Sequence, residues 1–242
     1  MNREYHQWHS PALGRTMELL VFGQTGAKVL MIPTRDGRFF EYEDLGLVGA
    51  LAPKIEAGEL QLYCVDSVDE ESLYCGDCHP AHRIQRHEQY QEHLLSEVLP
   101  LMAAKNGHTC TIAQGCSLGA YHAADIAFRH PQLFQKLAAF SGRFDLTLNV
   151  EHFGDLFEGY YDDTVYRHTP SHFLPDEQDS HRLAALRAMD IVLAIGQEDP
   201  FLANNRQLSA VLTDKGIPNE LHIWPGRAHR GGSWRRMAPL YI

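Results

Sequence analysis

Residues 115–119 read Gly-Cys-Ser-Leu-Gly, a G-x-S-x-G pattern that can present a serine hydroxyl as a nucleophile. The pattern alone is a weak signal, but its surroundings strengthen it. The sequence pattern predicts a strand at 109–113 and a helix at 118–129. A nucleophile elbow requires this succession of a strand, a sharp turn and a helix. The two glycines remove Cβ atoms where such a turn crowds its neighbours. Ser117 is therefore the candidate nucleophile, and the alternative is a glycine-rich turn without chemistry.

A neutral serine hydroxyl is a weak nucleophile and needs a base, which an acidic side chain orients. When the serine sits on an elbow of this kind, the acid comes later in the chain, after a late strand. Asp199 fits this position, because it follows the predicted strand 190–195 in the sequence Gly-Gln-Glu-Asp-Pro. Glu198 is its nearest rival, and capping of the following helix is the alternative role for Asp199.

The base is expected in the loop after the last strand. His229 lies in such a loop, after the predicted strand 220–224, whereas His222 lies within that strand. The alternative for His229 is a solvent-exposed loop histidine. The order serine, acid, histidine along the chain is far more specific than any one of the three residues.

The negative charge that develops on the attacked carbonyl oxygen needs N–H donors already in place. One donor is expected to be the backbone amide of Leu118, the residue after the nucleophile. The other is expected from the loop 33–37, which follows the apolar strand 28–32. The sequence leaves open whether that amide belongs to Thr34, Arg35 or a neighbour.

Alternation of strands and helices predicts an α/β fold with a mostly parallel central sheet flanked by helices. Strands are expected at 4–9, 16–22, 28–32, 60–65, 109–113, 136–140, 190–195 and 220–224, and helices at 44–57 with a break or kink at Pro53, 81–105, 118–129, 202–214 and 231–240. No repeat or linker interrupts this series, so residues 1–242 are interpreted as one domain of the α/β-hydrolase fold.

Residues 147–189 form a long excursion between the sixth and seventh strands, expected to be irregular up to about Met189. The excursion leaves the sheet on the same side as Ser117 and carries several aromatic residues, like a cap over the site. Tyr160 and Tyr161 are the candidate substrate-binding residues among them. The alternative is that these aromatic side chains form the private core of a small helical insertion.

Charge and composition exclude several other kinds of protein. The chain of 242 residues has a net charge of −10 and no lysine or arginine cluster, which disfavours binding to nucleic acid or anionic lipid. No signal peptide and no apolar run of about 18 residues occurs, so we expect a cytoplasmic protein without a membrane partner.

The five cysteines are an odd number, which argues against a disulfide framework. Cys75 and Cys78 form a C-x-x-C followed by His79 and His82, where a zinc or redox site is conceivable. A second ligand pair is missing, so a surface loop is the favoured interpretation. We therefore expect no metal and no cofactor.

At six segments the sequence resembles the putative-esterase family, the esterase D type of α/β-hydrolases. That family includes S-formylglutathione hydrolases, feruloyl esterase domains and mycolyltransferases. The segments are 37–44, 65–69, 115–123, 140–145, 196–200 and 226–229, and the resemblance is greatest to the small bacterial members. It implies Ser117 as nucleophile, Asp199 as acid and His229 as base. Cys116 and Leu118 in the elbow, and Arg-Gly-Gly-Ser after His229, depart from the family pattern.

Together these features predict a carboxylic ester hydrolase that forms an acyl-enzyme on Ser117, with His229 as general base and Asp199 as its orienting acid. An acyltransferase of the same fold differs only in whether water or another alcohol accepts the acyl group. A non-catalytic binding protein of the same fold is the other alternative. The expected partner is a small-molecule ester, and the sequence leaves open whether the chain forms a homo-oligomer.

Overall fold

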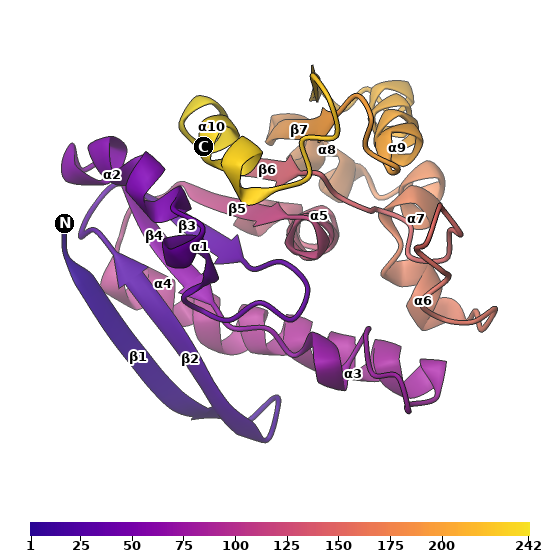
Figure 1. The fold of residues 1–242 in the computed structure, drawn as a ribbon, viewed down its shortest axis with the longest axis horizontal. Helices are drawn as coiled ribbons and strands as arrows, with labels where there is room; N and C mark the ends of the chain where they lie inside the picture. Colours follow the sequence, from indigo (N-terminus) through magenta and orange to yellow (C-terminus); the bar gives the residue numbers. More distant parts are fainter.

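The computed structural model describes residues 1–242 and contains one eight-stranded sheet (Figure 1). The strand order is β1-β2-β4-β3-β5-β6-β7-β8. The strands are β1 (Arg3–Ser10), β2 (Arg15–Phe22), β3 (Ala27–Ile32), β4 (Leu60–Val65), β5 (Thr111–Cys116), β6 (Lys136–Phe140), β7 (Asp190–Gly196) and β8 (Glu220–Trp224). Strand β2 pairs antiparallel with β1 and β4, and all other pairs are parallel. The predicted α/β-hydrolase fold with a mostly parallel sheet is confirmed.

Helices cover both faces of the sheet (Figure 1). They are α1 (Glu41–Asp44), α2 (Leu47–Glu56), α3 (Pro80–His93), α4 (Leu99–Lys105), α5 (Leu118–Arg129), α6 (Asp163–Arg167), α7 (Pro170–Asp176), α8 (Ser180–Ala188), α9 (Leu202–Asp214) and α10 (Gly231–Tyr241), with short turns at Asp69–Glu71 and Pro131–Leu133. Helices α2 and α10 pack on one face of the sheet, and α3, α4, α5 and α9 pack on the other. Strands β4 and β5 are buried along their whole length, as expected of strands covered on both sides.

Two predicted helices differ in detail from the structure. The helix expected at 44–57 is divided at Gly46, whose left-handed backbone (φ 76°) ends α1, while α2 continues through Pro53. The helix expected at 81–105 is continuous but contains a π turn at Leu94–Val98. That turn ends two residues before Pro100, which has no N–H for the regular hydrogen-bond ladder.

The excursion after β6 is not irregular as predicted, because it contains α6, α7 and α8. Aspartate side chains cap two of these short helices. Asp162 accepts hydrogen bonds from the amides of Thr164 and Val165, and Asp179 accepts them from the first turn of α8. These caps satisfy amides that the helix itself cannot satisfy, so helices too short to show a clear period still form.

The loop before α3 carries a disulfide between Cys75 and Cys78. The odd cysteine count argued against a disulfide framework, and this single bridge, with a separation of three residues, closes only a local loop. Cys64, Cys110 and Cys116 remain free thiols. Among the helices, none combines the length and the apolar character needed to cross a bilayer.

A buried group of ionisable side chains fastens the excursion to α3 and α5. Asp125 Oδ2 accepts hydrogen bonds from His87 Nε2 at 3.0 Å and from His168 Nδ1 at 2.7 Å. Glu88 and Arg129 also face the His168 imidazole. Burial lowers the pKa of His87 to about 3, so this ring is neutral. Burial alone would also lower the pKa of His168, but the charge and hydrogen bond of Asp125 outweigh it and raise the pKa.

The pKa of Asp125 is lowered, because the charge and hydrogen bond of His168 outweigh the opposite effect of burial. The stabilisation from Asp125 is therefore present above the pKa of an unfolded carboxyl group and lost as the pH falls. The stabilisation from His168 is present below the pKa of an unfolded imidazole and lost as the pH rises through its raised value.

We predict that Asp125→Asn lowers the free energy of unfolding by about 3 kcal/mol at pH values between the pKa of an unfolded carboxyl group and that of an unfolded imidazole. The reason is that removing one partner leaves a buried charge uncompensated. Denaturant unfolding across a pH series measures this difference. The control is Asp190→Asn, which removes the exposed ion pair with Lys136 and is expected to cost at most about 0.5 kcal/mol. Equal losses in the two variants would contradict the prediction.

Candidate active site

Ser117 stands on a sharp turn between β5 and α5, in the predicted strand–turn–helix arrangement. Its backbone has φ 57° and ψ −120°, a combination that residues with a Cβ rarely adopt. A Cβ on Gly115 would lie 2.0 Å from the carbonyl oxygen of Gly119, and one on Gly119 would lie 2.2 Å from that of Ile32. Only glycine fits at either position, so the expected role of both glycines in the turn is confirmed.

The structure brings Ser117, His229 and Asp199 together in one hydrogen-bonded chain. Nε2 of His229 lies 2.9 Å from Oγ of Ser117, and Nδ1 lies 2.8 Å from Oδ2 of Asp199. The Asp199 side chain is fully buried, and its second oxygen accepts the amide of Phe201 at 3.0 Å. The imidazole is 17% exposed, so a ligand in solution can reach it. The rival acid Glu198 is exposed and forms no ion pair with His229.

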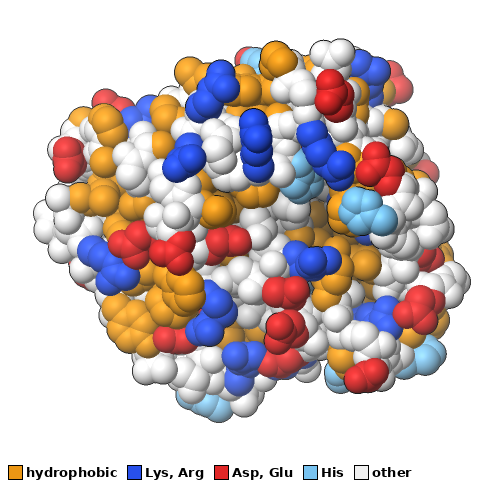
Figure 2. All heavy atoms as spheres, in the orientation of Figure 1, with side chains coloured by type: hydrophobic (Ala, Val, Ile, Leu, Met, Phe, Trp, Pro, Cys, Tyr) orange, Lys and Arg blue, Asp and Glu red, His pale blue; other side chains and the backbone are white.

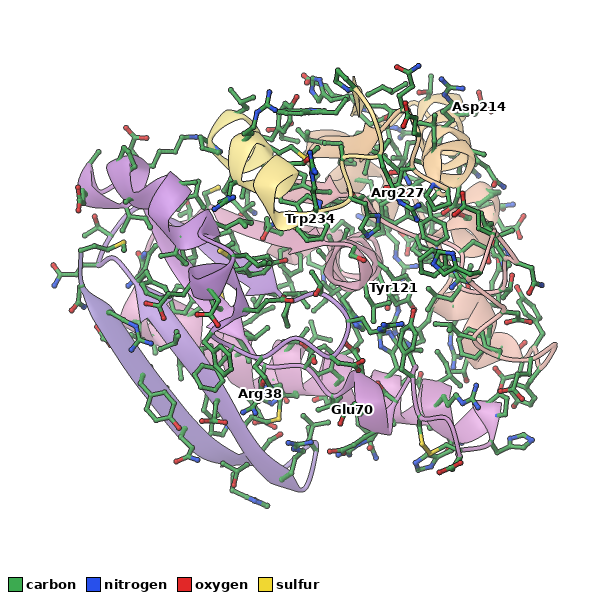
Figure 3. All side chains as sticks on the ribbon, viewed as in Figure 1. Arg38, Glu70, Tyr121, Asp214, Arg227 and Trp234 are labelled. Atoms are coloured by element: carbon green, nitrogen blue, oxygen red, sulfur yellow. A yellow bond between two sulfur atoms is a disulfide. The ribbon has the colours of Figure 1, made fainter.

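Helix α10 supports the His229 ring, and it begins immediately after Arg230. The Trp234 indole packs edge-on against the imidazole, with ring centroids 5.6 Å apart. Its N–H donates to Oγ of Ser141 at 3.1 Å, which fixes the indole next to the end of β6. Figure 3 shows Trp234 below α10, toward the middle of the molecule. The Arg-Gly-Gly-Ser segment that departs from the family pattern thus opens the helix that holds the ring.

Hydrogen bonding distinguishes the two amides that the sequence left open for the second oxyanion donor. The Thr34 amide donates to Oε2 of Glu41 at 2.8 Å and is therefore already occupied. The Arg35 amide donates no hydrogen bond within the chain. Leu118 is the first residue of α5, where amides have no partner inside the helix. The amides of Leu118 and Arg35 are thus both free of partners within the chain, whereas that of Thr34 is not.

Tyr42 joins the two strand ends that carry the site, and the sequence analysis did not identify it. Its hydroxyl donates to the carbonyl oxygen of Ile32 at 2.7 Å and accepts the amide of Cys116 at 2.9 Å. The contacts tie the end of β3, where the loop 33–37 begins, to the residue before Ser117. Burial raises the pKa of the Cys116 thiol to about 12, so this neighbour stays neutral and does not compete as a nucleophile.

A cavity of about 460 Å³ opens above Ser117. Its lining consists of Thr34, Arg35, Tyr74, Ser117, Leu118, Ser141, Arg143, His152, Phe153, Gly154, Leu156, Phe201 and Trp234. The excursion contributes a wall, as predicted, but with His152, Phe153, Gly154 and Leu156 rather than with Tyr160 and Tyr161. Tyr160 donates to Asp162, and Tyr161 is 51% exposed and bonds to His172. Both tyrosine hydroxyls are held by side chains within the excursion, away from the cavity.

One group of side chains has spacing suited to a metal ion, the buried His87, Asp125 and His168 described above. A cation there would face the Arg129 guanidinium, which lies 3.1 Å from Nδ1 of His168. The group also lies outside the lining of the cavity above Ser117. These residues therefore fit a structural cluster better than a metal site.

Comparison with family models matches residues 54–237 to a family described as "Putative esterase". Comparison with curated proteins finds no match.

Among solved structures, the chain is similar to an S-formylglutathione hydrolase from Agrobacterium tumefaciens, with a TM-score of 0.75, 14% identity, and coverage of 98% of this chain and 91% of that one. A ferulic acid esterase gives a TM-score of 0.73 at 15% identity, and the match covers 98% of this chain and 94% of the esterase. The fluorophosphonate-binding serine hydrolase F of Staphylococcus aureus gives a TM-score of 0.71 at 14% identity, and the match covers 99% of this chain and 97% of that one. At such low identities the likeness demonstrates a shared fold along almost the whole chain.

We predict that Tyr42→Phe lowers kcat for ester cleavage by about tenfold, because the elbow and the oxyanion loop lose their common hydrogen-bonded link. Steady-state kinetics and thermal unfolding are measured together. The matched control is Tyr63→Phe, which removes another buried hydroxyl that donates to Gln61 on β4. If both variants retain wild-type kcat, Tyr42 has no positioning role.

Proposed function

The chain belongs to the putative-esterase family and is a serine esterase of the α/β-hydrolase fold; from this premise we propose that it hydrolyses carboxylic esters through an acyl-enzyme on Ser117. His229 acts as general base and Asp199 holds its ring. The observation that carries the proposal is the unbroken chain of hydrogen bonds from Ser117 Oγ through the imidazole to the Asp199 carboxylate. This arrangement matches the geometry that activates a serine hydroxyl.

In the first half of the reaction, Oγ of Ser117 attacks the ester carbonyl carbon while its proton passes to Nε2 of His229. The buried Asp199 carboxylate accepts the Nδ1 proton in a hydrogen bond, which selects the tautomer with a free Nε2 and stabilises the imidazolium. The amides of Leu118 and Arg35 donate to the carbonyl oxygen as it becomes negatively charged. The imidazolium then returns the proton to the leaving alcohol, and the acyl group remains on Ser117.

In the second half, water enters where the alcohol left and gives a proton to Nε2 of His229 as it attacks the acyl carbon. The same two amides hold the second oxyanion, and as this intermediate collapses the proton on Nε2 passes to Oγ, which releases the acid and restores Ser117 and the neutral imidazole. Phe153, Leu156 and Phe201 supply apolar walls for the organic part of the ester in place of Tyr160 and Tyr161.

We predict that Ser117→Ala lowers kcat on a 4-nitrophenyl ester by about 10⁴-fold, with residual turnover from the oxyanion donors. The variant is expected to unfold at or above the wild-type temperature, because alanine removes no buried packing at this turn. Retention of more than about a tenth of wild-type kcat would show that another residue is the nucleophile. If an added short alcohol makes its ester the main product rather than the free acid, the protein is an acyltransferase.

The assignment of the acid is tested by a pair of amides. Asp199→Asn is expected to lower kcat by about 10³- to 10⁴-fold, because an amide no longer favours the tautomer with a free Nε2. Glu198→Gln, one residue away and exposed, serves as the matched control and should leave kcat close to wild type. The reverse result would make Glu198 the acid.

A further inference from the structure

The charges around the site are opposite to those of the chain as a whole. The chain has 31 acidic and 21 basic residues, yet the cavity above Ser117 is lined by Arg35 and Arg143 and by no acidic residue. A second hollow of about 390 Å³ lies on the His229 side and is lined by Arg227, Arg230 and Arg236, again without an acid. Five arginines therefore border the reacting groups in a protein of net charge −10.

Arg143 is a buried cation without a carboxylate partner. The residue is 5% exposed and forms no ion pair within 4.0 Å. Its guanidinium donates to the backbone carbonyl oxygens of Asp145, Leu146, Leu148 and Gly154 and lies beside the Tyr74 hydroxyl, and Nη1 has no partner within hydrogen-bond distance. The nearby Asp145 carboxylate is occupied by His172 and Thr147. Burying a charge is costly unless an opposite charge compensates it, so this wall of the cavity is prepared for an anion.

The arginines on the His229 side are exposed and weakly paired. Arg230, Arg235 and Arg236 form no ion pair, and Arg227 reaches only Glu151 at 3.6 Å. Figure 2 shows basic side chains spread across the upper part of the face, above a hollow, and Figure 3 labels Arg227 among them on the loop before α10. Arg35, at the cavity, is 3.5 Å from Asp36 and lies over the Tyr74 ring. Like charges gathered at a concave site produce a field that attracts oppositely charged ligands.

We propose that the ester taken by this site carries a negatively charged group, a carboxylate or a phosphate, in its acyl or its alcohol part. The inference rests on the proposed function and names its substrate class. The anionic oxygens accept charge-assisted hydrogen bonds from Arg143 or Arg35 in the cavity, and the arginines of residues 227–236 raise the rate of encounter. Arg143 is thus a specificity-determining residue, since it can distinguish charged from neutral esters without taking part in proton transfer.

The test compares esters that carry a charged group with esters in which that group is capped or replaced by a neutral one. In the acyl arm, mono-4-nitrophenyl glutarate is compared with its methyl ester, in which the charge is capped. In the alcohol arm, 3-carboxyphenyl butyrate and 3-phosphonooxyphenyl butyrate are compared with 3-(methoxycarbonyl)phenyl butyrate. Rates without enzyme are subtracted. The charged member of at least one arm is expected to have a kcat/KM about 10- to 100-fold higher, and this advantage should shrink as sodium chloride is added.

Arginine variants then test whether these side chains cause the preference for charged over neutral esters. Arg143→Gln keeps hydrogen-bond donors for the carbonyl oxygens but removes the charge, and should reduce the charged-to-neutral ratio at least tenfold. If that variant does not fold, the exposed double variant Arg230→Gln with Arg236→Gln should lower the ratio and weaken its salt dependence. The control is Arg182→Gln, an exposed arginine paired with Glu177 away from the cavity, which should leave the ratio unchanged.

Two failures are distinguishable. Equal or lower kcat/KM for the charged esters in both arms, with normal Ser117-dependent turnover of the neutral ones, would overturn the inference and leave the esterase function intact. Failure to cleave any ester, charged or neutral, would overturn the proposed function and this inference with it.

Discussion

Ser117 can face His229 only because its backbone is held at φ 57° and ψ −120°, and the rest of the site depends on this constraint. A non-glycine residue in such a conformation costs about 1–3 kcal/mol, so its surroundings must hold it there. The Ser117 amide donates to the carbonyl oxygen of Phe140 on β6, and the preceding amide donates to Tyr42. On the other side of the turn, Gly119 allows α5 to approach the end of β3. Three strand ends therefore meet at Ser117.

The parallel sheet supplies the remaining parts at the same edge. Asp199 follows β7 and His229 follows β8, and because these strands run parallel to β5, their loops emerge next to the elbow. The Asp199 carboxylate is fully buried, while the His229 imidazole stays partly exposed and packs against Trp234 of α10. The sheet edge and α10 thus hold Ser117, Asp199 and His229 in place, while loops and the excursion contribute much of the cavity lining. This division allows the cavity walls to carry arginines without disturbing the hydrogen-bonded chain.

The sequence predicted those features that depend on local pattern and chain order. The fold is confirmed, and the three residues proposed for catalysis were identifiable because each follows a strand in the order that an elbow implies. The features that the sequence did not predict depend on contacts between residues far apart in the chain. Tyr42 resembles an ordinary core tyrosine, and only the structure shows that it reaches Cys116, 74 residues away. Choosing Arg35 over Thr34 required knowing that Glu41 occupies the Thr34 amide. The helices of the excursion did carry readable signals in the capping residues Asp162 and Asp179.

The central claim is that Ser117 is the residue that becomes acylated, and covalent labelling tests it most directly. A fluorophosphonate probe reacts with an activated serine, and tryptic digestion then yields residues 106–129, bounded by Lys105 and Arg129, as one peptide containing Ser117. Tandem mass spectrometry is expected to find the adduct on Ser117, with labelling abolished in Ser117→Ala. An adduct on a different residue, or continued ester cleavage by a protein whose Ser117 stays unlabelled, would contradict the account.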